Sequence, residues 1–314
     1  MSQMPWISFC ISTYKRPEIL HKQLLLLLQQ TYEDFEIVIS DNDPDGSAEK
    51  VIEIIADPRL RYFKNRENIG IIKSFNNSIK MAVGEFIVPV TDDDPIDANF
   101  LEFFRHLYHQ HPGFSIYCGF KRTGKEEGEI EFISRDSFLP EVLDPMKTPN
   151  LLWSSTLMRR MDVIKTGSIP DFGSPHLADH AFIVQVGSVN GGVIVNRMFS
   201  SLTSHDSNFS KLNFEFYVTG CEGFYHHLVD FFSDHPKLKH FKRAILNHLA
   251  RWFIAVTFNL KKYYTITKYN PVLVTKVNDF ASEILNLPFM SRYLLRYKTK
   301  NLIFKIKRSL HLLR

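Results

Sequence analysis

The chain has 314 residues, of which 44% are hydrophobic and 23% charged, which is the composition of a folded, soluble-type protein. Its formal net charge is only +4, and its three scattered cysteines predict neither a disulfide framework nor a CxxC metal site. Such cysteines favour a reducing compartment. No apolar stretch reaches the roughly 18 residues that a spanning helix needs, and the start lacks the basic region of a signal peptide, so we expect neither.

Strand and helix signals alternate over the first third of the chain. Apolar, β-branched runs predict strands, and apolar residues at helical spacing between them predict helices. Strands are predicted at 6–12, 35–40, 60–63 and 85–90, and helices from Pro17, at 47–56 and at 71–83. This alternation predicts an α/β fold with a mostly parallel, doubly wound sheet. In such sheets ligands bind beyond the carboxyl ends of the strands.

Three polar clusters follow the predicted strands at those ends. They are Thr13–Arg16, Asp41–Asp43 and Thr91–Asp94. Since the carboxyl ends of parallel strands meet at one edge of a sheet, these clusters predict a binding site there.

The run of three aspartates, Asp92–Asp94, is the sharpest feature of the sequence. A donor that carries a diphosphate needs a hard cation to neutralise its charge, and hard cations prefer carboxylate oxygens. The alternative is an Asp-rich turn that caps a helix beginning near Pro95, because aspartate is a favoured N-cap. Three consecutive carboxylates exceed what one cap requires, which favours a cation.

The remainder of the chain is less regular. A strand is predicted at 114–120, a charged hairpin or loop at 121–131, a loop at 140–149, a strand–turn–helix at 151–166 and a loop running into a helix at 175–186. From about Phe214 onward the pattern is helical and aromatic.

Five motifs together resemble the N-terminal half of family 2 glycosyltransferases, which are inverting enzymes of the GT-A fold. The motifs are Ile11–Pro17, Glu36–Asn42, Asn68–Gly70, Gly84–Ile87 and Thr91–Asp94. Their order and spacing are more specific than any one motif, and the resemblance covers roughly residues 6–210. It implies a GT-A domain over 1–210, with a donor half at about 1–120 and an acceptor half at about 121–210. A helical, basic region is expected over 211–314.

The resemblance implies donor-binding roles for seven residues. Those residues are Thr13 and Tyr14 at the nucleoside, Arg16 near the phosphates, Asp41 at the pyrimidine edge, Asp92 at the ribose, Asp93 as metal ligand and Lys73 at the phosphates. Lys73 would replace an arginine, because the family's common Ala-Arg-Asn motif reads Ser74-Phe75-Asn76 here. Ser12 and Lys15 also stand where the family usually has Pro and Asn. The alternative for Asp41 is a turn-forming Asx residue.

Inversion by direct displacement needs a carboxylate base that takes the proton of the acceptor hydroxyl. The resemblance places this base at Asp179, in Pro175–His180, with Asp171 as the second choice. A first-turn acid favoured by the helix dipole is the alternative for Asp179. Ser204–Ser207 resembles a late family motif in which a histidine approaches the metal or the diphosphate, so His205 is a candidate metal ligand.

The C-terminal segment is basic and aromatic. Residues 289–314 carry eight Lys and Arg and no acid, interleaved with Tyr, Leu, Ile and Phe. Amphipathic basic helices of this kind lie on anionic membrane surfaces, so we expect peripheral membrane association. The alternatives are a packing helix with a solvated basic face and a nucleic-acid patch, which nothing else in the sequence supports.

The predicted function is transfer of a sugar from a nucleotide-diphosphate donor, expected to be UDP-linked, to a hydroxyl of a glycan or lipid-linked oligosaccharide, with inversion and with Mn²⁺ or Mg²⁺. The expected setting is polysaccharide or O-antigen assembly in the cytoplasm, at the inner face of the cell membrane. A sugar-phosphate nucleotidyltransferase is one alternative, but residues 12–17 lack the glycine-rich loop it needs. A non-catalytic glycan-binding or scaffold protein on a decayed transferase fold is the other.

Overall fold

The computed structural model describes residues 4–203 and 209–310 and divides into two compact units. The sheet unit comprises Met1–Val142, Met146–Asp171 and Asp179–Ser204, and the helical unit comprises Leu143–Pro145, Phe172–Ala178 and His205–Arg314. The predicted boundary at residue 210 and the division into donor and acceptor halves stay predictions.

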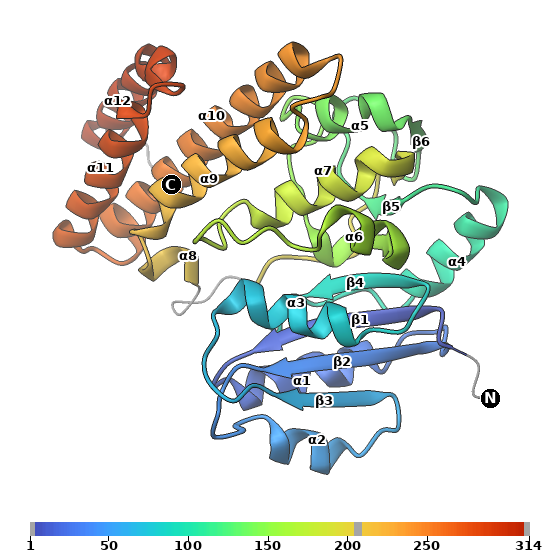
Figure 1. The fold of residues 1–314 in the computed structure, drawn as a ribbon. Coiled ribbons are helices and arrows are strands. Elements are labelled where there is room, and N and C mark those ends of the chain that lie inside the picture. Colours follow the sequence, from blue (N-terminus) through green and yellow to red (C-terminus); the bar gives the residue numbers. More distant parts are fainter. Residues whose placement is uncertain (1–3, 204–208, 311–314) are drawn as a thin grey trace. The chain divides into compact units, whose positions relative to one another are not determined.

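Within the described residues, the sheet unit holds one eight-stranded sheet with the order β3-β2-β1-β4-β7-β5-β8-β6 (Figure 1). Its strands are β1 (Ile7–Thr13), β2 (Phe35–Asp41), β3 (Leu60–Lys64), β4 (Phe86–Val90), β5 (Ile116–Gly119), β6 (Ile130–Ile133), β7 (Thr156–Arg159) and β8 (Gly192–Val195). The first four strands in this order are mutually parallel, β7 is antiparallel to β4 and β5, and β6 is antiparallel to β8. The predicted, mostly parallel α/β class is confirmed.

Helices cover both faces of the parallel strands. The side chains of Ile7, Phe9 and Ile11 belong to the main apolar core together with Leu20 and Leu24 of α1 (Pro17–Leu27). Helix α3 (Ile71–Met81) covers the other face and contacts both β1 and β2. A strand covered on both faces is buried along its whole length and mostly apolar, and every residue of β2 is buried.

The other helices of the sheet unit flank the remaining strands. They are α2 (Glu49–Ile55), α4 (Phe100–Gln110), α5 (Arg135–Val142), α6 (Arg160–Thr166) and α7 (Ala178–Asn190). Neither β8, in the short run after Gly191, nor α5, which carries Pro140 inside the segment predicted as a loop, was predicted.

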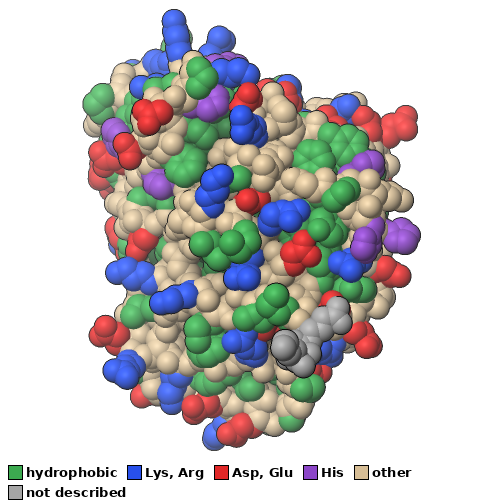
Figure 2. Space-filling model, turned by 45° about the vertical axis from the view of Figure 1, so that its right-hand side comes forward, with side chains coloured by type: hydrophobic (Ala, Val, Ile, Leu, Met, Phe, Trp, Pro, Cys, Tyr) green, Lys and Arg blue, Asp and Glu red, His purple; other side chains and the backbone are tan. Residues whose placement is uncertain are grey.

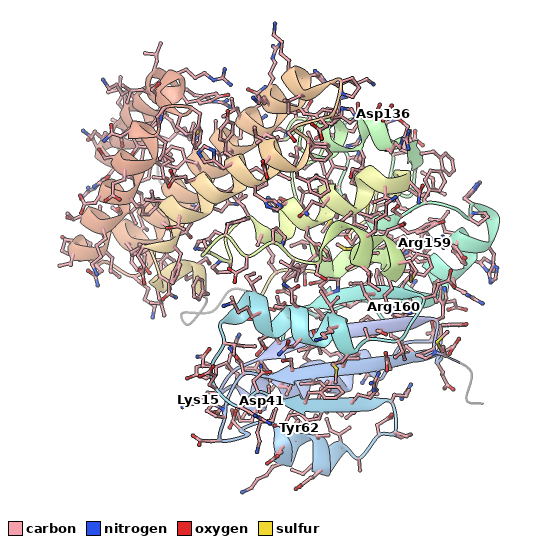
Figure 3. All side chains as sticks on the ribbon, in the orientation of Figure 1. Lys15, Asp41, Tyr62, Asp136, Arg159 and Arg160 are labelled. Carbon is pink, nitrogen blue, oxygen red and sulfur yellow. The ribbon has the colours of Figure 1, made fainter. Side chains whose placement is uncertain are left out.

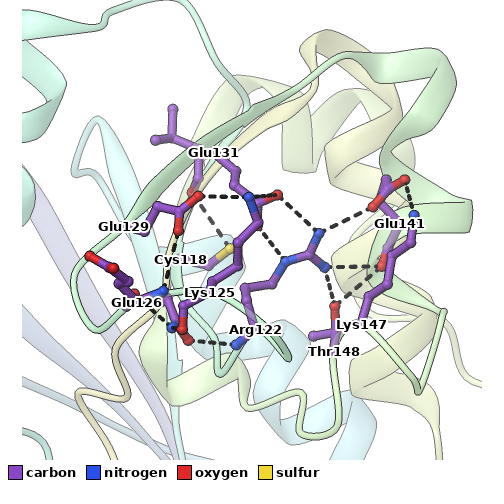
Figure 4. A network of polar contacts seen from close by, with 11 residues as sticks. Cys118, Arg122, Lys125, Glu126, Glu129, Glu131, Glu141, Lys147 and Thr148 are labelled. Atoms are coloured by element: carbon purple, nitrogen blue, oxygen red, sulfur yellow. Dashed lines mark hydrogen bonds and ion pairs between the residues drawn. The ribbon is translucent and has the colours of Figure 1, made fainter.

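A buried arginine joins the loop after β5 to β6 and α5 (Figure 4). The Arg122 side chain is 3% exposed, and its guanidinium pairs with Glu131 at 2.6 Å and Glu141 at 3.1 Å. It also donates to the Thr148 hydroxyl. Removing one partner of a buried charge is strongly destabilising, so this network fixes a segment for which the sequence predicted a charged hairpin or loop followed by a loop.

The helical unit contains α8 (Phe209–Leu212), α9 (Phe216–Phe231), α10 (Leu238–Lys262), α11 (Pro271–Asn286) and α12 (Leu294–Ser309). Helices α9 and α11 pack through aromatic rings, with Tyr217 and Phe280 stacked at 4.7 Å. Asn270 caps α11 by accepting from the backbone N–H of Leu273, and Pro271 occupies the first turn. The predicted helical C-terminal region is confirmed. In residues 4–203 and 209–310, every helix is too short or too polar to cross a membrane.

Candidate active site

The candidate site lies where the parallel strands end. The strand register aligns Thr13 of β1 with Asp41 of β2, and Asp41 with Lys64 of β3. Strand β4 ends at Val90, beside Ile11, so the chain beyond it enters the same edge. The predicted edge therefore gathers the polar clusters that follow β1, β2 and β4.

Arg16 bridges two of the three aspartates. Its Nη1 lies 2.7 Å from Asp92 Oδ1, and its Nη2 lies 2.7 Å from Asp93 Oδ2. The Thr13 hydroxyl donates to Asp92 Oδ2 at 3.0 Å. Burial raises the pKa of Asp92 to about 6, opposed by the Arg16 charge and reinforced by the neighbouring Asp93. The structure thus brings together Thr13, Arg16, Asp92 and Asp93, all of which the sequence singled out.

Asp94 has a structural part in the same turn. Its carboxylate accepts from the backbone N–H of Thr203 at 3.0 Å, and the Gln23 side chain donates to its carbonyl oxygen. The alternative prediction of a helix beginning near Pro95 is wrong, because α4 begins at Phe100 and Asn99 precedes it. The aspartates therefore do not cap that helix.

The chain at Phe199 and Ser200, a few residues before His205, pairs with the residues that follow the acidic turn. Ile96 forms a β-bridge with Ser200, and the backbone N–H of Asp97 donates to the carbonyl of Phe199. His205 itself lies outside the described residues, so its role at the metal stays a prediction.

The acidic turn has the chemistry of a divalent-cation site. In the part of the chain that the structure describes, no group of three or more His, Cys, Asp or Glu side chains could hold a metal ion. Mg²⁺ bound with nucleotides, however, usually takes only one or two protein carboxylates and completes its shell with phosphates and water. Asp92 and Asp93 supply such hard oxygen donors, and the Arg16 guanidinium lies against both of them. The residues fit an ion that binds together with a diphosphate.

Asp41 is fully buried at the end of β2. Its carboxylate accepts from the backbone N–H groups of Asp43 and Ala48, each at 3.0 Å, and from the Tyr62 hydroxyl at 2.9 Å (Figure 3). These bonds are those of the turn-forming alternative. Contact between Asp41 and a pyrimidine stays a prediction.

A cluster of asparagines beside Asp41 was not predicted. The Asn42 amide donates to Asn68 at 2.7 Å and accepts from the Ile69 backbone and from Asn65. Asn65 in turn accepts from Asn77 of α3. The cluster orders the Asn68–Gly70 turn and presents amide groups at the carboxyl edge. Its sequence signal was the recurrence of asparagine after two successive strands.

Two of the sequence motifs, Glu36–Asn42 and Gly84–Ile87, begin at the opposite end of the strands, where their first residues stabilise the fold. Glu36 Oε1 accepts from the Ser8 hydroxyl at 2.6 Å and from the Val83 backbone at 2.8 Å, and Arg61 pairs with its other oxygen. A Cβ atom on Gly84 would lie 2.7 Å from the Ser8 nitrogen. Glu36 and Gly84 are therefore required by packing, away from the site.

Tyr14 and Lys73 are exposed residues in the parallel-stranded part of the sheet unit. The Tyr14 ring is 42% exposed just beyond β1, and the Lys15 ammonium lies 5.5 Å from its centroid. Lys73 is exposed on α3, whose neighbouring residues Ile72 and Ser74 are buried. The nucleoside role of Tyr14 and the phosphate role of Lys73 stay predictions.

Lys15 has an unusual backbone conformation, with φ at +54°. Side chains other than asparagine, aspartate and glycine rarely adopt the left-handed region, at a cost of roughly 1–2 kcal/mol. The backbone at Lys15 is therefore strained.

We therefore expect Lys15→Asn to stabilise the protein by up to about 1 kcal/mol, because asparagine tolerates this conformation. Chemical denaturation of the two proteins measures the difference. Lys22→Asn, in the middle of helix α1, is the control and should destabilise instead. A lower stability of Lys15→Asn would show that the lysine side chain, and not the backbone, determines this loop.

Asp179 lies in the first turn of α7. The preceding Leu177 is buried and has a φ of +67°, a backbone conformation that is rare outside glycine and is often found at functional sites. Burial raises the pKa of the Asp179 carboxyl to about 6, although two backbone N–H groups of the turn stabilise its ionised form. The neighbouring His180, whose Nε2 lies 3.8 Å from Asp179 Oδ2, is neutral, because burial lowers its pKa to about 4. A carboxyl with a raised pKa is a stronger base than an ordinary one. Asp171, the second choice, is exposed.

Comparison with known proteins identifies the family. Residues 8–171, more than half of the chain, match the family model Glycosyl transferase family 2. The chain belongs to glycosyltransferase family 2. The match includes the strands β1 to β4, the Arg16–Asp92–Asp93 cluster and Asp171, and it ends before Asp179.

Curated relatives of this family 2 chain are similar to it over about a third of its length. The GalNAc(5)-diNAcBac-PP-undecaprenol beta-1,3-glucosyltransferase of Campylobacter jejuni is 30% identical over 96 residues, or 30% of this chain and 31% of the relative. The putative colanic acid biosynthesis glycosyl transferase WcaA of Escherichia coli is 29% identical over 106 residues, or 33% and 38%. The chain therefore matches only about a third of the length of these relatives.

Solved structures resemble the family 2 chain over most of its length. The mannosyltransferase PcManGT of Pyrobaculum calidifontis, in complex with GDP-Man and Mn²⁺, has a TM-score of 0.56 and 17% identity and covers 96% of this chain and 88% of its own. TarS of S. aureus, in complex with UDP-GlcNAc, has a TM-score of 0.53 and 16% identity and covers 91% of each chain. At this identity the likeness concerns the fold, and the GT-A architecture predicted from the sequence is confirmed.

Proposed function

We propose that this family 2 chain transfers a sugar from a nucleotide-diphosphate donor to a hydroxyl of a glycan or lipid-linked acceptor, with inversion. The observation that carries the proposal is the pair of carboxylates, Asp92 and Asp93, at the carboxyl edge of the sheet, bridged by Arg16. Their position after β4 and beside β1 is where an open α/β sheet binds its ligand.

The donor is proposed to lie along this edge with its nucleoside toward Thr13, Tyr14 and the turn held by Asp41. The half-exposed Tyr14 ring offers a face on which a base can stack. The amide groups of the asparagine cluster offer both donors and acceptors to a base edge. UDP is the expected nucleotide, by resemblance to the family, with Asp92 at the ribose and Lys73 toward the phosphates.

Mn²⁺ or Mg²⁺ is proposed to bind at Asp93, with His205 as a further ligand, and would stabilise the charge of the departing diphosphate. Arg16 pairs with Asp93 and Asp92 in the structure. We propose that it releases Asp93 when the donor binds and turns its charge toward the phosphates, as the sequence resemblance implies.

Asp179 is proposed as the general base. The acceptor oxygen attacks the anomeric carbon and forms the new glycosidic bond, the bond from that carbon to the diphosphate oxygen breaks, and the acceptor proton passes to the Asp179 carboxylate. One displacement of this kind inverts the configuration at the anomeric carbon. The raised pKa of Asp179, about 6, suits a group that must accept a proton near neutral pH.

Membrane association is proposed through the basic helix α12, at the inner face of the cell membrane. The C. jejuni relative is named for an undecaprenol-linked substrate, and WcaA for colanic acid biosynthesis. By analogy, a lipid-linked acceptor in surface-polysaccharide or O-antigen assembly is the proposed setting. The nucleotidyltransferase alternative is disfavoured by the family match.

Donor binding is tested by a thermal-shift screen of UDP, GDP and their sugar conjugates, with and without Mn²⁺. A ligand at 100 times its Kd stabilises the native state by about 2.7 kcal/mol, so we expect one nucleotide to raise the melting temperature by several degrees, and only with metal. If none of these nucleotides stabilises the protein, the non-catalytic alternative on a decayed transferase fold is favoured.

A further inference from the structure

Helix α12 is attached to α10 along one face. Lys261 of α10 is buried and donates to the Tyr297 hydroxyl at 2.7 Å and to the Asn301 side chain at 3.1 Å. The ring centroids of Phe258 and Phe304 lie 5.6 Å apart. Positions 297, 301 and 304 follow helical spacing, so α12 packs on α10 through a single stripe.

The opposite face of α12 is apolar and exposed. Leu295 is 76% exposed, Leu302 60% and Ile306 50%, and the three recur at helical spacing. Basic residues flank them on both sides, namely Arg296, Lys300 and Lys307 on one flank and Lys298 and Lys305 on the other. Figure 2 shows basic and acidic side chains interspersed over one face of the protein. Helix α12 therefore has the pattern of a helix that lies in a membrane interface.

A groove of about 600 Å³ lies between α10 and α12. Its apolar wall is formed by Ile254 of α10 and by Leu295 and Ile303 of α12, and its cations are Arg251, Arg296 and Lys300. Leu295 belongs both to the groove and to the outward stripe, so the groove opens onto the face that would meet a membrane. Acidic residues are missing from its lining in the described chain.

We propose that this groove binds a single anionic lipid, with the lipid phosphate at Arg251, Arg296 and Lys300 and an acyl or prenyl chain along Ile254, Leu295 and Ile303. Cations beside an apolar wall complement a molecule that carries a phosphate next to a hydrocarbon chain. A nucleic acid would need aromatic or polar surfaces for its bases, and the groove offers aliphatic ones. The lipid would hold the protein at a fixed position on the membrane, beyond general electrostatic attraction.

This inference rests on the proposed membrane association and not on sugar transfer. The probe is a short-chain phosphatidylglycerol below its micelle concentration, titrated into the full chain by calorimetry. Arg296→Gln/Lys300→Gln should weaken its binding at least about tenfold, because hydrogen bonds to charged groups are lost. Ala255→Trp, which fills the groove at unchanged charge, should weaken it as much.

The matched control is Lys298→Gln/Lys307→Gln, which removes the same charge from exposed positions of α12 outside the groove. It should bind the short-chain lipid within about twofold of wild type. On phosphatidylglycerol vesicles both double variants should lose affinity, because each basic residue near the surface contributes attraction. Arg296→Gln/Lys300→Gln should lose more than the control, because it also loses the lipid bound in the groove.

The proposed lipid site in the groove would be overturned by an equal loss of short-chain lipid binding in both double variants, or by wild-type lipid binding in Ala255→Trp. Only general surface attraction would then remain. Stronger binding of a single-stranded oligonucleotide that Ala255→Trp does not change would overturn the choice of ligand. Nucleotide binding at the sheet edge, measured on the same variants by melting temperature, should remain as in wild type. A failure of the lipid site is thus separable from a failure of the proposed transferase activity.

Discussion

Replacing Asp179 with asparagine is expected to lower kcat by a factor of about 10²–10⁴, the usual rate contribution of general acid–base catalysis. Asparagine keeps the size of the side chain and much of its hydrogen bonding but takes no proton. Affinities for nucleotide and metal should stay near wild type, since the group acts in the transition state and not in ground-state binding. Steady-state kinetics and calorimetric titration of the variant give both quantities.

The pH dependence supplies a second readout of the same variant. The base must be ionised, so the wild-type rate should rise with pH through about 6, the pKa of Asp179, and then level off. Because the folded pKa lies above the unfolded value, folding favours the protonated form, and that stability is lost as pH rises through about 6. Asp179→Asn should therefore melt higher than wild type at pH 8 and close to it at pH 4.

Asp171→Asn is the matched control, because Asp171 is exposed and precedes the same helix. It should leave kcat within about twofold of wild type if Asp179 is the base. If Asp179 only caps α7, asparagine is an equally good cap, and kcat should not change. A fully active Asp179→Asn with an impaired Asp171→Asn would transfer the role to Asp171.

Replacing Asp93 with alanine should remove metal-dependent donor binding. Even groups that only support metal ligands change affinity by about 10–100-fold, so loss of a ligand should weaken UDP binding in Mn²⁺ by at least that factor. Without metal, the affinities of variant and wild type for UDP should converge. The control is Asp97→Ala, an exposed acid nearby in sequence that pairs with Arg197. Unchanged binding of UDP with Mn²⁺ by Asp93→Ala would exclude Asp93 as a ligand.

Arg16→Gln, in contrast, should raise the affinity for Mn²⁺ in the absence of UDP. The guanidinium lies 2.7 Å from both carboxylates, so a cation must displace it, and its removal should raise the affinity for free Mn²⁺. Binding of UDP together with Mn²⁺ should weaken, because a positive charge toward the phosphates is lost. An unchanged Mn²⁺ affinity would show that Arg16 and the ion occupy different positions.

Local sequence patterns predicted the parallel half of the sheet and the edge that carries the site. Strands β1, β2 and β4 are rich in apolar residues and are each followed by polar residues, and both features lie within a few neighbouring positions. Strand β8 is only four residues long, Gly192–Val195, and begins at the second of two glycines, so its pattern was too short to recognise.

The contacts within the site could not be read from the sequence, because they join distant positions. The Arg16 bridge connects residues 76 and 77 positions apart, and its geometry depends on how β1 and β4 pair. Asp41 was predicted to face a ligand or to form a turn, and only the backbone positions of Asp43 and Ala48 show that it forms the turn. The asparagine cluster likewise exists only once β2, β3 and α3 are packed.

The two strands at the margins of the sheet, β3 and β6, have a consequence for self-association. Open sheet margins can pair with another chain and seed aggregation, and proteins counter this with short strands and charge. Strand β6 has four residues, and Lys125, Glu129 and Glu131 form ion pairs beside it. Strand β3 has five residues and carries Arg61 and Lys64. An intruding strand would have to desolvate these charges, so both margins favour a protein that stays dispersed when it is concentrated.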